Sequence, residues 1–298
     1  SGSTPVFEDT NLFTMAEEST LLGRIIATDI DGDSQQDGDT DFDYAVTAQG
    51  ANGFVTVYGD GTWEYTPNID FFGTDSFELK VIDSLGATAT KTVTVSVLNI
   101  NDAPVVNTVS AAPVFTEDGA PVLVDPAVQV TDGDSADFDG GILSVDVSTG
   151  YAPGDTLAFD GTVTLSAGMT NGSLVSLDGG TTTIGTINID GTGGTLTVDL
   201  TDSATPALIE QLARTVTFEN TSIEPGTTPR TVSFTLSDGD GGTSLAVDQT
   251  VTITPVNDAP EILGAVQAGN ALSFDGMDDA VATPVTALGA EFTVEAWF

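Results

Sequence analysis

Carboxylate side chains gather at the ends of strand-like runs, and they are the residues of this sequence best suited to chemistry. The clusters are Asp29-Ile30-Asp31-Gly32-Asp33, Asp83, Asp132-Gly133-Asp134 and Asp238-Gly239-Asp240, with single acids at Glu18 and Glu117. Calcium takes six to eight oxygen ligands, and alternating Asp residues in one loop offer carboxylates and a carbonyl to one ion. The alternative is a solvated acidic loop in which Asp-Gly pairs only make turns. The same order of acids in both halves of the chain favours calcium.

Two familiar calcium motifs are excluded by their spacing. An EF-hand loop needs Gly at its sixth position and an acid at its twelfth. Counted from Asp29, these positions hold Ser34 and Thr40. The nonapeptide repeat of calcium-binding β-helices also fails, because Leu196 stands where its third Gly should be.

The composition excludes several classes of function. Five basic residues against 45 acidic ones give a net charge of −40. This charge argues against binding to nucleic acid or to anionic membrane surfaces. Cys and His are both absent, so disulfides, thiolate chemistry and the commonest general base are absent too. No apolar run approaches 18 residues, so we expect no membrane insertion. We also expect no enzymatic activity.

A four-residue motif divides the chain into modules. Asn101-Asp102-Ala103-Pro104 recurs as Asn257-Asp258-Ala259-Pro260, and each copy closes a β-rich run. A motif that recurs at the end of successive segments is typical of tandem modules. We therefore predict modules at 1–104 and 105–260, followed by a segment at 261–298. Since the chain stops inside a strand-like run, we expect it to be part of a longer protein.

The pattern of short strands predicts an all-β fold. Residues 53–58 and 62–65 flank a Gly-Asp-Gly tip, which is a hairpin signal. About seven such strands in about 100 residues are typical of a β-sandwich. The second module repeats this plan with Thr/Gly/Asp-rich hairpins at 145–202. It also holds one short helix, predicted from Thr205 as the cap and Pro206 in the first turn.

Several runs together resemble a cadherin-type repeat. They are Phe13 to Gly23, Ala27-Thr28-Asp29-Ile30-Asp31, Val81-Ile82-Asp83 and Asn101-Asp102-Ala103-Pro104. The resemblance implies tandem antiparallel Ig- and cadherin-like β-sandwiches, the second enlarged, with calcium held between consecutive domains. The upper domain supplies a Glu, a second acid and the linker Asn-Asp, and the lower domain supplies an Asp-x-Asp and a later Asp.

The resemblance implies a ligand set for each junction. The first junction would use Glu18, Asp70, Asn101 and Asp102 above and Asp132, Asp134 and Asp238 below. Asp29, Asp31 and Asp83 would face a preceding domain, and Glu117, Asn257 and Asp258 would face the third segment. Two departures stand out in each linker: Asn99 and Pro255 replace the family's first Asp, and Ala103 and Ala259 replace its final Asn. They imply fewer ions at each junction or more weakly bound ones, and the third segment shows no Asp-x-Asp of this kind.

The later parts of the chain resemble modules of large surface proteins. The second module looks like the larger cadherin-like repeats of giant bacterial adhesins and RTX-type proteins. Residues 271–279 and 292–297 are similar to the opening of a laminin-G-like, concanavalin-type jelly roll. These resemblances imply a secreted or cell-surface spacer in cell adhesion and biofilms. Its partners would be neighbouring domains and a glycan or cell-surface protein bound by the C-terminal domain.

Two other functions stay open. Jelly rolls of this type also occur in polysaccharide-degrading enzymes, where paired carboxylates at about 5–10 Å act as acid and base. The acids here lie almost entirely in turns, and only two Trp are present to line a sugar cleft. The modules could also bind a glycan directly, through sheet edges or the 145–202 insertion.

Overall fold

The computed structural model describes residues 4, 6–7, 12–28 and 42–257. It divides the chain into two compact units. The first holds residues 1–102 with the loop 132–135, and the second holds residues 103–131 and 136–298. The regular structure described is almost entirely β-strand, which confirms the predicted all-β class. The segment predicted to open a jelly roll, 261–298, lies outside the described residues.

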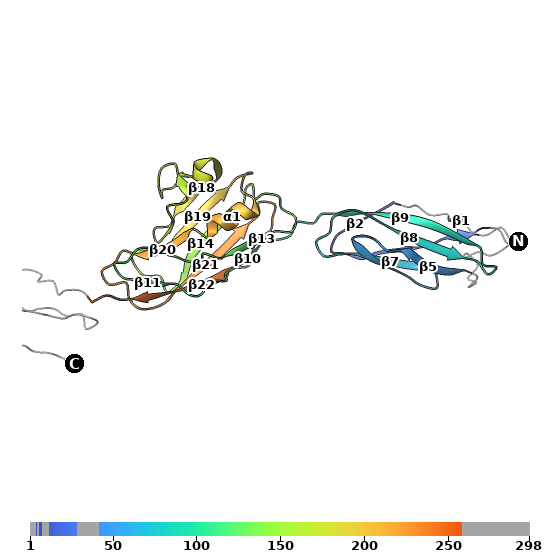
Figure 1. Cartoon of the computed structure of the whole chain (residues 1–298), viewed down its shortest axis with the longest axis horizontal. Helices are drawn as coiled ribbons and strands as arrows, with labels where there is room; N and C mark the ends of the chain where they lie inside the picture. The colour runs from blue at the N-terminus through green and yellow to red at the C-terminus, as the bar shows by residue number, and fades with distance from the viewer. Residues whose placement is uncertain (1–3, 5, 8–11, 29–41, 258–298) are drawn as a thin grey trace, which may run out of the picture. The chain divides into compact units, whose positions relative to one another are not determined.

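The first unit is a sandwich of two main sheets. Its strands are β1 (Val6–Phe7), β2 (Leu12–Ala16), β3 (Leu21–Arg24), β4 (Ala27–Thr28), β5 (Asp43–Ala48), β6 (Gly53–Val57), β7 (Thr62–Pro67), β8 (Gly73–Ile82) and β9 (Thr88–Leu98). One sheet has the order β2-β9-β8-β5 and the other β3-β7-β6, while β1 pairs with β4 (Figure 1). Alternation along β8 buries Phe77, Leu79 and Val81 between the sheets.

Aromatic rings fill the centre of this sandwich. Trp63 packs edge-on against Phe13 and Phe77, with ring centroids 5.3 Å apart in both pairs. Tyr65 stacks on Phe77 at 5.5 Å. Gly23 lies directly against the Trp63 ring, so the strand can approach the ring only because position 23 has no Cβ.

The predicted hairpin forms β6 and β7, and its tip contains a local turn that recurs. The Asp60 carboxylate accepts the Thr62 N–H at 3.0 Å and the Thr62 hydroxyl at 2.6 Å. Between them Gly61 has a φ of 79°, a left-handed conformation that favours glycine. The Asp-Gly-Thr sequences at 160–162 and 190–192 make the same pair of hydrogen bonds. The same side-chain hydrogen bonds thus fix two hairpin tips and the turn between β15 and β16.

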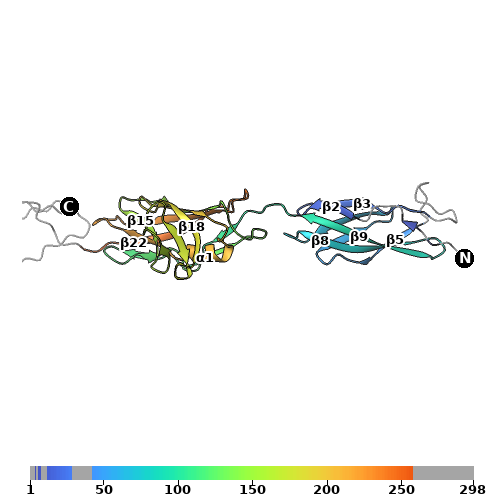
Figure 2. The ribbon, with the colours of Figure 1, turned by 90° about the horizontal axis from the view of Figure 1, so that it is seen from above.

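A parallel pair joins the two ends of the first unit. Leu12–Ala16 of β2 pairs with Thr94–Leu98 of β9, and the two strands run side by side in both views (Figures 1 and 2). The sequence predicts antiparallel sheets, and the other pairings of this unit are antiparallel. The parallel pair was not predicted.

The second unit is larger. Its strands are β10 (Val105–Asn107), β11 (Val114–Thr116), β12 (Val122–Leu123), β13 (Gln129–Thr131), β14 (Ile142–Thr149), β15 (Asp155–Phe159), β16 (Thr164–Leu165), β17 (Leu174–Leu177), β18 (Thr182–Asp190), β19 (Thr195–Leu200), β20 (Val216–Asn220), β21 (Arg230–Ser237) and β22 (Val247–Thr254), with a 3-10 turn η2 (Asp178–Gly180). One sheet has the order β11-β22-β21-β14-β19-β18-β17-β16, the other β12-β20-β15, and β10 pairs with β13.

The 145–202 insertion mainly extends the large sheet. Strands β16 to β19 are consecutive antiparallel neighbours there, and β15 joins the small sheet. Phe115 of β11 meets Phe218 of β20 edge-on at 5.7 Å in the core. β11 runs parallel to β22, with Val114–Thr116 against Thr252–Thr254. The second unit therefore repeats the parallel closure of the first.

The predicted helix is α1 (Pro206–Ala213). Thr205 caps it by accepting the Leu208 N–H at 3.4 Å, and Pro206 occupies the first turn. Ile209 and Leu212 point into the core. Glu210 accepts the N–H of Val130 in β13 at 3.0 Å, which attaches the helix to that strand.

A buried ion pair joins three strands of the second unit. Arg230, at the start of β21, lies 3.0 Å from the Asp155 carboxylate of β15, and both side chains are almost fully buried. Asn220 of β20 donates to the same carboxylate at 2.6 Å. The guanidinium also donates to the carbonyls of Pro225 and Thr228. Every charge of this network is therefore partnered, as burial requires.

Candidate metal centre

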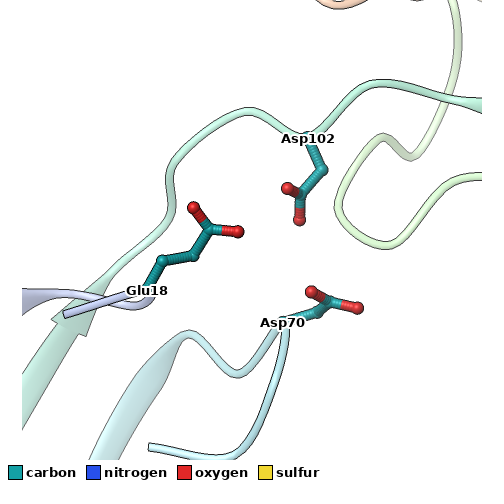
Figure 3. Close-up of side chains that lie close together, drawn as sticks. All are labelled: Glu18, Asp70 and Asp102. Atoms are coloured by element: carbon teal, nitrogen blue, oxygen red, sulfur yellow. The ribbon is translucent and has the colours of Figure 1, made fainter. Parts of the chain in front are cut away.

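Three acids from separate loops converge at one end of the first unit. Glu18 lies in the turn after β2, Asp70 in the loop between β7 and β8, and Asp102 in the segment that follows β9. One carboxylate oxygen of each lies within 4.8 Å of the other two. Figure 3 shows the three side chains pointing into a common space. Asp70 has a φ of 57°, a left-handed conformation uncommon outside glycine, and its carboxylate faces the other two.

The charges of this cluster oppose one another. Burial raises the pKa of Asp102, and the negative charges of Asp70, Glu18, Asp134 and Glu17 raise it further. Like charges at this separation disfavour a second ionised carboxylate. The Asp102 Oδ2 is also buried without a hydrogen-bond partner. A cation in this space would reduce the repulsion among the carboxylates and would give the Asp102 Oδ2 a partner.

The loop 132–135 adds further oxygens to the same unit. Asp134 accepts the side-chain amide of Asn99 at 2.9 Å and the backbone N–H of Asp102 at 3.3 Å. Asp132 Oδ1 accepts the N–H groups of Asp134 and Ser135, at 3.2 and 2.9 Å. These bonds leave the Asp132 Oδ2 buried without a hydrogen-bond partner. Asp132 thus presents the same kind of unmet oxygen as Asp102.

Glu17 belongs to this region and was not predicted. Its side chain is 3% exposed, and Oε1 accepts the backbone N–H of Ile100 at 2.5 Å. Oε2 is buried without a hydrogen-bond partner. Since Ile100 directly precedes Asn101, Glu17 attaches the end of β2 to the first residue of the linker motif.

The equivalence of Glu18 and Glu117 assumed in the sequence comparison is off by one residue. Glu117 is 4% exposed and accepts the N–H of Val256 at 2.8 Å, one residue before Asn257. It therefore corresponds to Glu17. Strand alternation contains the signal, because positions 13, 15 and 17 share the inward face while Glu18 lies outside. Glu18 remains a candidate ligand through its place in the cluster.

The remaining predicted residues lie apart from this cluster or outside the described residues. Asp83 is buried, and its Oδ1 accepts the N–H groups of Leu85 and Ala87 at 2.9 and 2.7 Å. Asp238 belongs to the second unit, where it accepts three N–H groups of its own turn, residues 240–242. Its sharing of an ion with Asp132 and Asp134 stays a prediction. Asn101 and Asn257 are exposed. Asp29, Asp31 and Asp258 lie outside the described residues.

The donor set suits a hard divalent cation. The candidate ligands are carboxylate oxygens, and no imidazole or thiolate occurs in the chain. Oxygen-only sites of this kind suit Ca²⁺ or Mg²⁺, and flexible loops suit the variable geometry of Ca²⁺.

Comparison with known proteins supports the fold class. Residues 3–96 match the family model of the bacterial Ig domain, which covers the first unit. No curated protein matches the chain. Among solved structures, the chain is similar to PcdhgB3 EC1-4, at 15% identity and a TM-score of 0.43, covering 85% of this chain and 50% of that one. The chain thus spans half of that structure.

Two further solved structures are similar to the chain. The protocadherin GammaB4 extracellular domain is 18% identical, with a TM-score of 0.40. The match covers 87% of this chain and 33% of that structure. Human protocadherin-24 EC1-2 is 14% identical, with a TM-score of 0.39. The match covers 85% of this chain and 99% of that structure. Within the described ranges, no helix is long and apolar enough to cross a membrane.

Proposed function

We propose that this chain is a calcium-stabilised, non-catalytic module of a large extracellular adhesin, in which it acts as a spacer that presents a ligand-binding domain. The observation that carries the proposal is the convergence of Glu18, Asp70 and Asp102, with one oxygen of each within 4.8 Å of the others. These acids come from three loops, so an ion bound to them would tie the loops together.

Buried oxygens without partners support a cation over an empty acidic surface. Glu17, Asp102 and Asp132 each present one such oxygen, and all three belong to the first unit. A buried carboxylate oxygen that lacks a donor costs free energy, and a bound Ca²⁺ would supply its positive charge. Glu17 and Asp132 would join Glu18, Asp70, Asp102 and Asp134 as ligands.

Calcium should therefore stabilise the first unit. A ligand at about 100 times its Kd stabilises the folded state by about 2.7 kcal/mol. For a unit of this size, that corresponds to a rise in Tm on the order of 10 °C. We expect differential scanning calorimetry of the first transition to show this rise when calcium replaces EGTA.

Asp102→Asn is the sharpest variant for this test. In calcium it should lose most of the rise in Tm, because a ligand and a charge are removed. In EGTA it should be at least as stable as the wild type, because the repulsion that raises the pKa of Asp102 is gone. This reversal between the two conditions is not expected of a variant that merely damages the fold.

Glu78→Gln serves as the matched control. Glu78 lies on β8 outside the cluster and accepts the Thr47 hydroxyl at 2.7 Å, which the Gln carbonyl can still do. It removes the same single charge and should keep the full calcium response. A wild type whose Tm ignores calcium, or an Asp102→Asn variant that gains as much as the wild type, would rule the calcium site out.

The adhesin role and the partners are part of the same proposal. The Ig-like fold and the oxygen-only site support a structural module outside the cell. We propose neighbouring domains of the same chain as its first partners, and a glycan or cell-surface protein bound through the domain that begins at 261. A glycan array probed with the chain would test the second partner. Release of sugar from a polysaccharide would instead favour the enzyme alternative.

A further inference from the structure

In each unit, a strand near the start of the unit runs parallel to the strand that ends the unit. β2 pairs with β9 over five residues, and β11 pairs with β22 over three. Tension passes through the short strands β1 and β10 before it reaches these pairs. When a chain is pulled from both ends, two parallel strands of this kind must slide along each other. All hydrogen bonds between them then resist at once, instead of opening one by one.

Glu17 extends this ladder beyond the last backbone pair. Its N–H donates to the Leu98 carbonyl at 3.2 Å, and its carboxylate accepts the Ile100 N–H at 2.5 Å. One residue therefore holds two successive positions at the exit of β9. The carboxylate end of this bond is buried, although Ile100 itself is 48% exposed.

Glu117 repeats the arrangement in the second unit. Its N–H donates to the Thr254 carbonyl at 3.0 Å, and its carboxylate accepts the Val256 N–H at 2.8 Å. The bonded residues are 83 positions apart in the first unit and 139 in the second. The same contact thus recurs in both units, across intervening segments of very different length.

We infer that Glu17 and Glu117 are side-chain rungs, meaning that each carboxylate adds a hydrogen bond to the end of the backbone ladder between the two parallel strands. These bonds resist sliding of the strands under tension and fix the residue before each Asn-Asp motif. A hydrogen bond to an ionised carboxylate is about twice as strong as a neutral one. Breaking it by sliding leaves a buried charge without its donor, which adds to the resistance. The locking does not require metal, so it is separable from the calcium proposal.

Single-molecule force spectroscopy of the whole chain in EGTA tests this inference. The two units are told apart by their extension on unfolding, about 30 nm for residues 12–98 and about 50 nm for residues 114–254. Glu17→Ala should lower the unfolding force of the shorter event and leave the longer one unchanged. Glu117→Ala should do the reverse, so each variant carries its own internal control.

Two further variants separate the rung from charge effects. Glu17→Gln keeps a side-chain oxygen that can accept the Ile100 N–H but loses the charge, so its unfolding force should lie between those of the wild type and Glu17→Ala. Glu78→Gln removes a charge of the same unit without touching the rung, and it should not lower the force in EGTA. If Glu17→Ala unfolds at the wild-type force, or Glu78→Gln weakens the unit as much, the inference is wrong.

Amide hydrogen exchange keeps the test decisive even if Glu17→Ala fails to fold. In the wild type in EGTA, the Ile100 and Val256 amides should be protected although neither lies in a strand. Glu117→Ala should increase exchange at Val256 by about tenfold or more, with Ile100 unchanged. Open-chain exchange at both amides in the wild type would overturn the inference.

Discussion

Gly23 lies against the Trp63 ring in the core of the first unit. A Cβ at this position would come within 2.1 to 2.7 Å of three ring atoms, so the ring or the strand must move. Overpacking of this kind costs about 1–3 kcal/mol. We expect Gly23→Ala to lower the free energy of unfolding of the first unit by about that amount in urea denaturation. Gly59→Ala is the control, because nothing lies within 4 Å of its Cβ position.

Asp75 gives the first unit a dependence on acid. Burial acts to raise its pKa, but hydrogen bonds from Tyr65 at 2.7 Å and from the Asn52 N–H at 3.0 Å outweigh it, with a net lowering. When the pKa of a carboxyl is lower in the folded state than in the unfolded state, its ionised form stabilises the fold. This contribution to the free energy of unfolding is complete above about pH 4 and is lost as the pH falls through the pKa of the folded state. Asp75→Asn should therefore reduce the loss of stability between pH 7 and pH 3.

The comparison with Asp60→Asn makes the acid prediction specific. The pKa of Asp60 is also lowered, chiefly by the Thr62 hydroxyl, but its turn is exposed. Solvent screens such an interaction, so this variant should lose stability toward acid nearly as the wild type does. Equal pH profiles for wild type and Asp75→Asn in urea denaturation would contradict the assignment.

Among the elements of the second unit, β15, β20 and β21 depend on one ion pair. Replacing Arg230 by Met leaves the Asp155 carboxylate buried and without its cation. Breaking a buried pair in this way costs about 3–5 kcal/mol. We expect the thermal transition of the second unit to fall sharply while that of the first stays in place.

Arg214 supplies the control for this variant. It pairs with Glu210 at 2.6 Å on the surface of α1, and its side chain is 40% exposed. Exposed pairs of this kind contribute less than about 1 kcal/mol, and the bond from Arg214 Nε to the Val128 carbonyl adds about 1 kcal/mol. Arg214→Met should therefore shift the second transition clearly less than Arg230→Met does. A shift as large as that of Arg230→Met would mean that burial is not the cause.

Local elements were predictable from the sequence, and their partners were not. The Gly-Asp-Gly tip predicted the β6–β7 hairpin, and Thr205 with Pro206 predicted α1, because turn and cap signals act between near neighbours. The pairing of β2 with β9 joins residues about 80 positions apart, and no local signal specifies it. Alternation at positions 13, 15 and 17 indicates that Glu17 points inward, but its hydrogen bond to Ile100 depends on this long-range pairing.

At the scale of the whole molecule, repulsion among 45 acidic residues opposes folding. Salt screens such repulsion, with a Debye length of about 10 Å at 0.1 M. We expect the Tm of the chain in EGTA to rise between about 20 mM and 0.5 M NaCl, because the folded state gathers the charges more closely. Scanning calorimetry at several salt concentrations would measure it, and a flat profile would contradict it.

In the first unit, calcium should raise the Tm by more than the screening effect of salt does. Millimolar calcium hardly changes the ionic strength, so a rise in Tm at that concentration requires a specific site. Magnesium at the same concentration is a matched control for charge. We expect a smaller rise with magnesium, since it demands octahedral geometry and releases its water reluctantly.

The three Asp-Gly-Thr turns also bear on how the protein ages. Asp-Gly bonds isomerise when the glycine nitrogen attacks the Asp side chain. Here each Asp carboxylate is held by the N–H and hydroxyl of the following Thr. The N–H groups of Gly61 and Gly191 are committed to the carbonyls of Tyr58 and Thr195, at 3.0 and 2.9 Å. Held this way, the Asp60–Gly61 and Asp190–Gly191 bonds should resist isoaspartate formation.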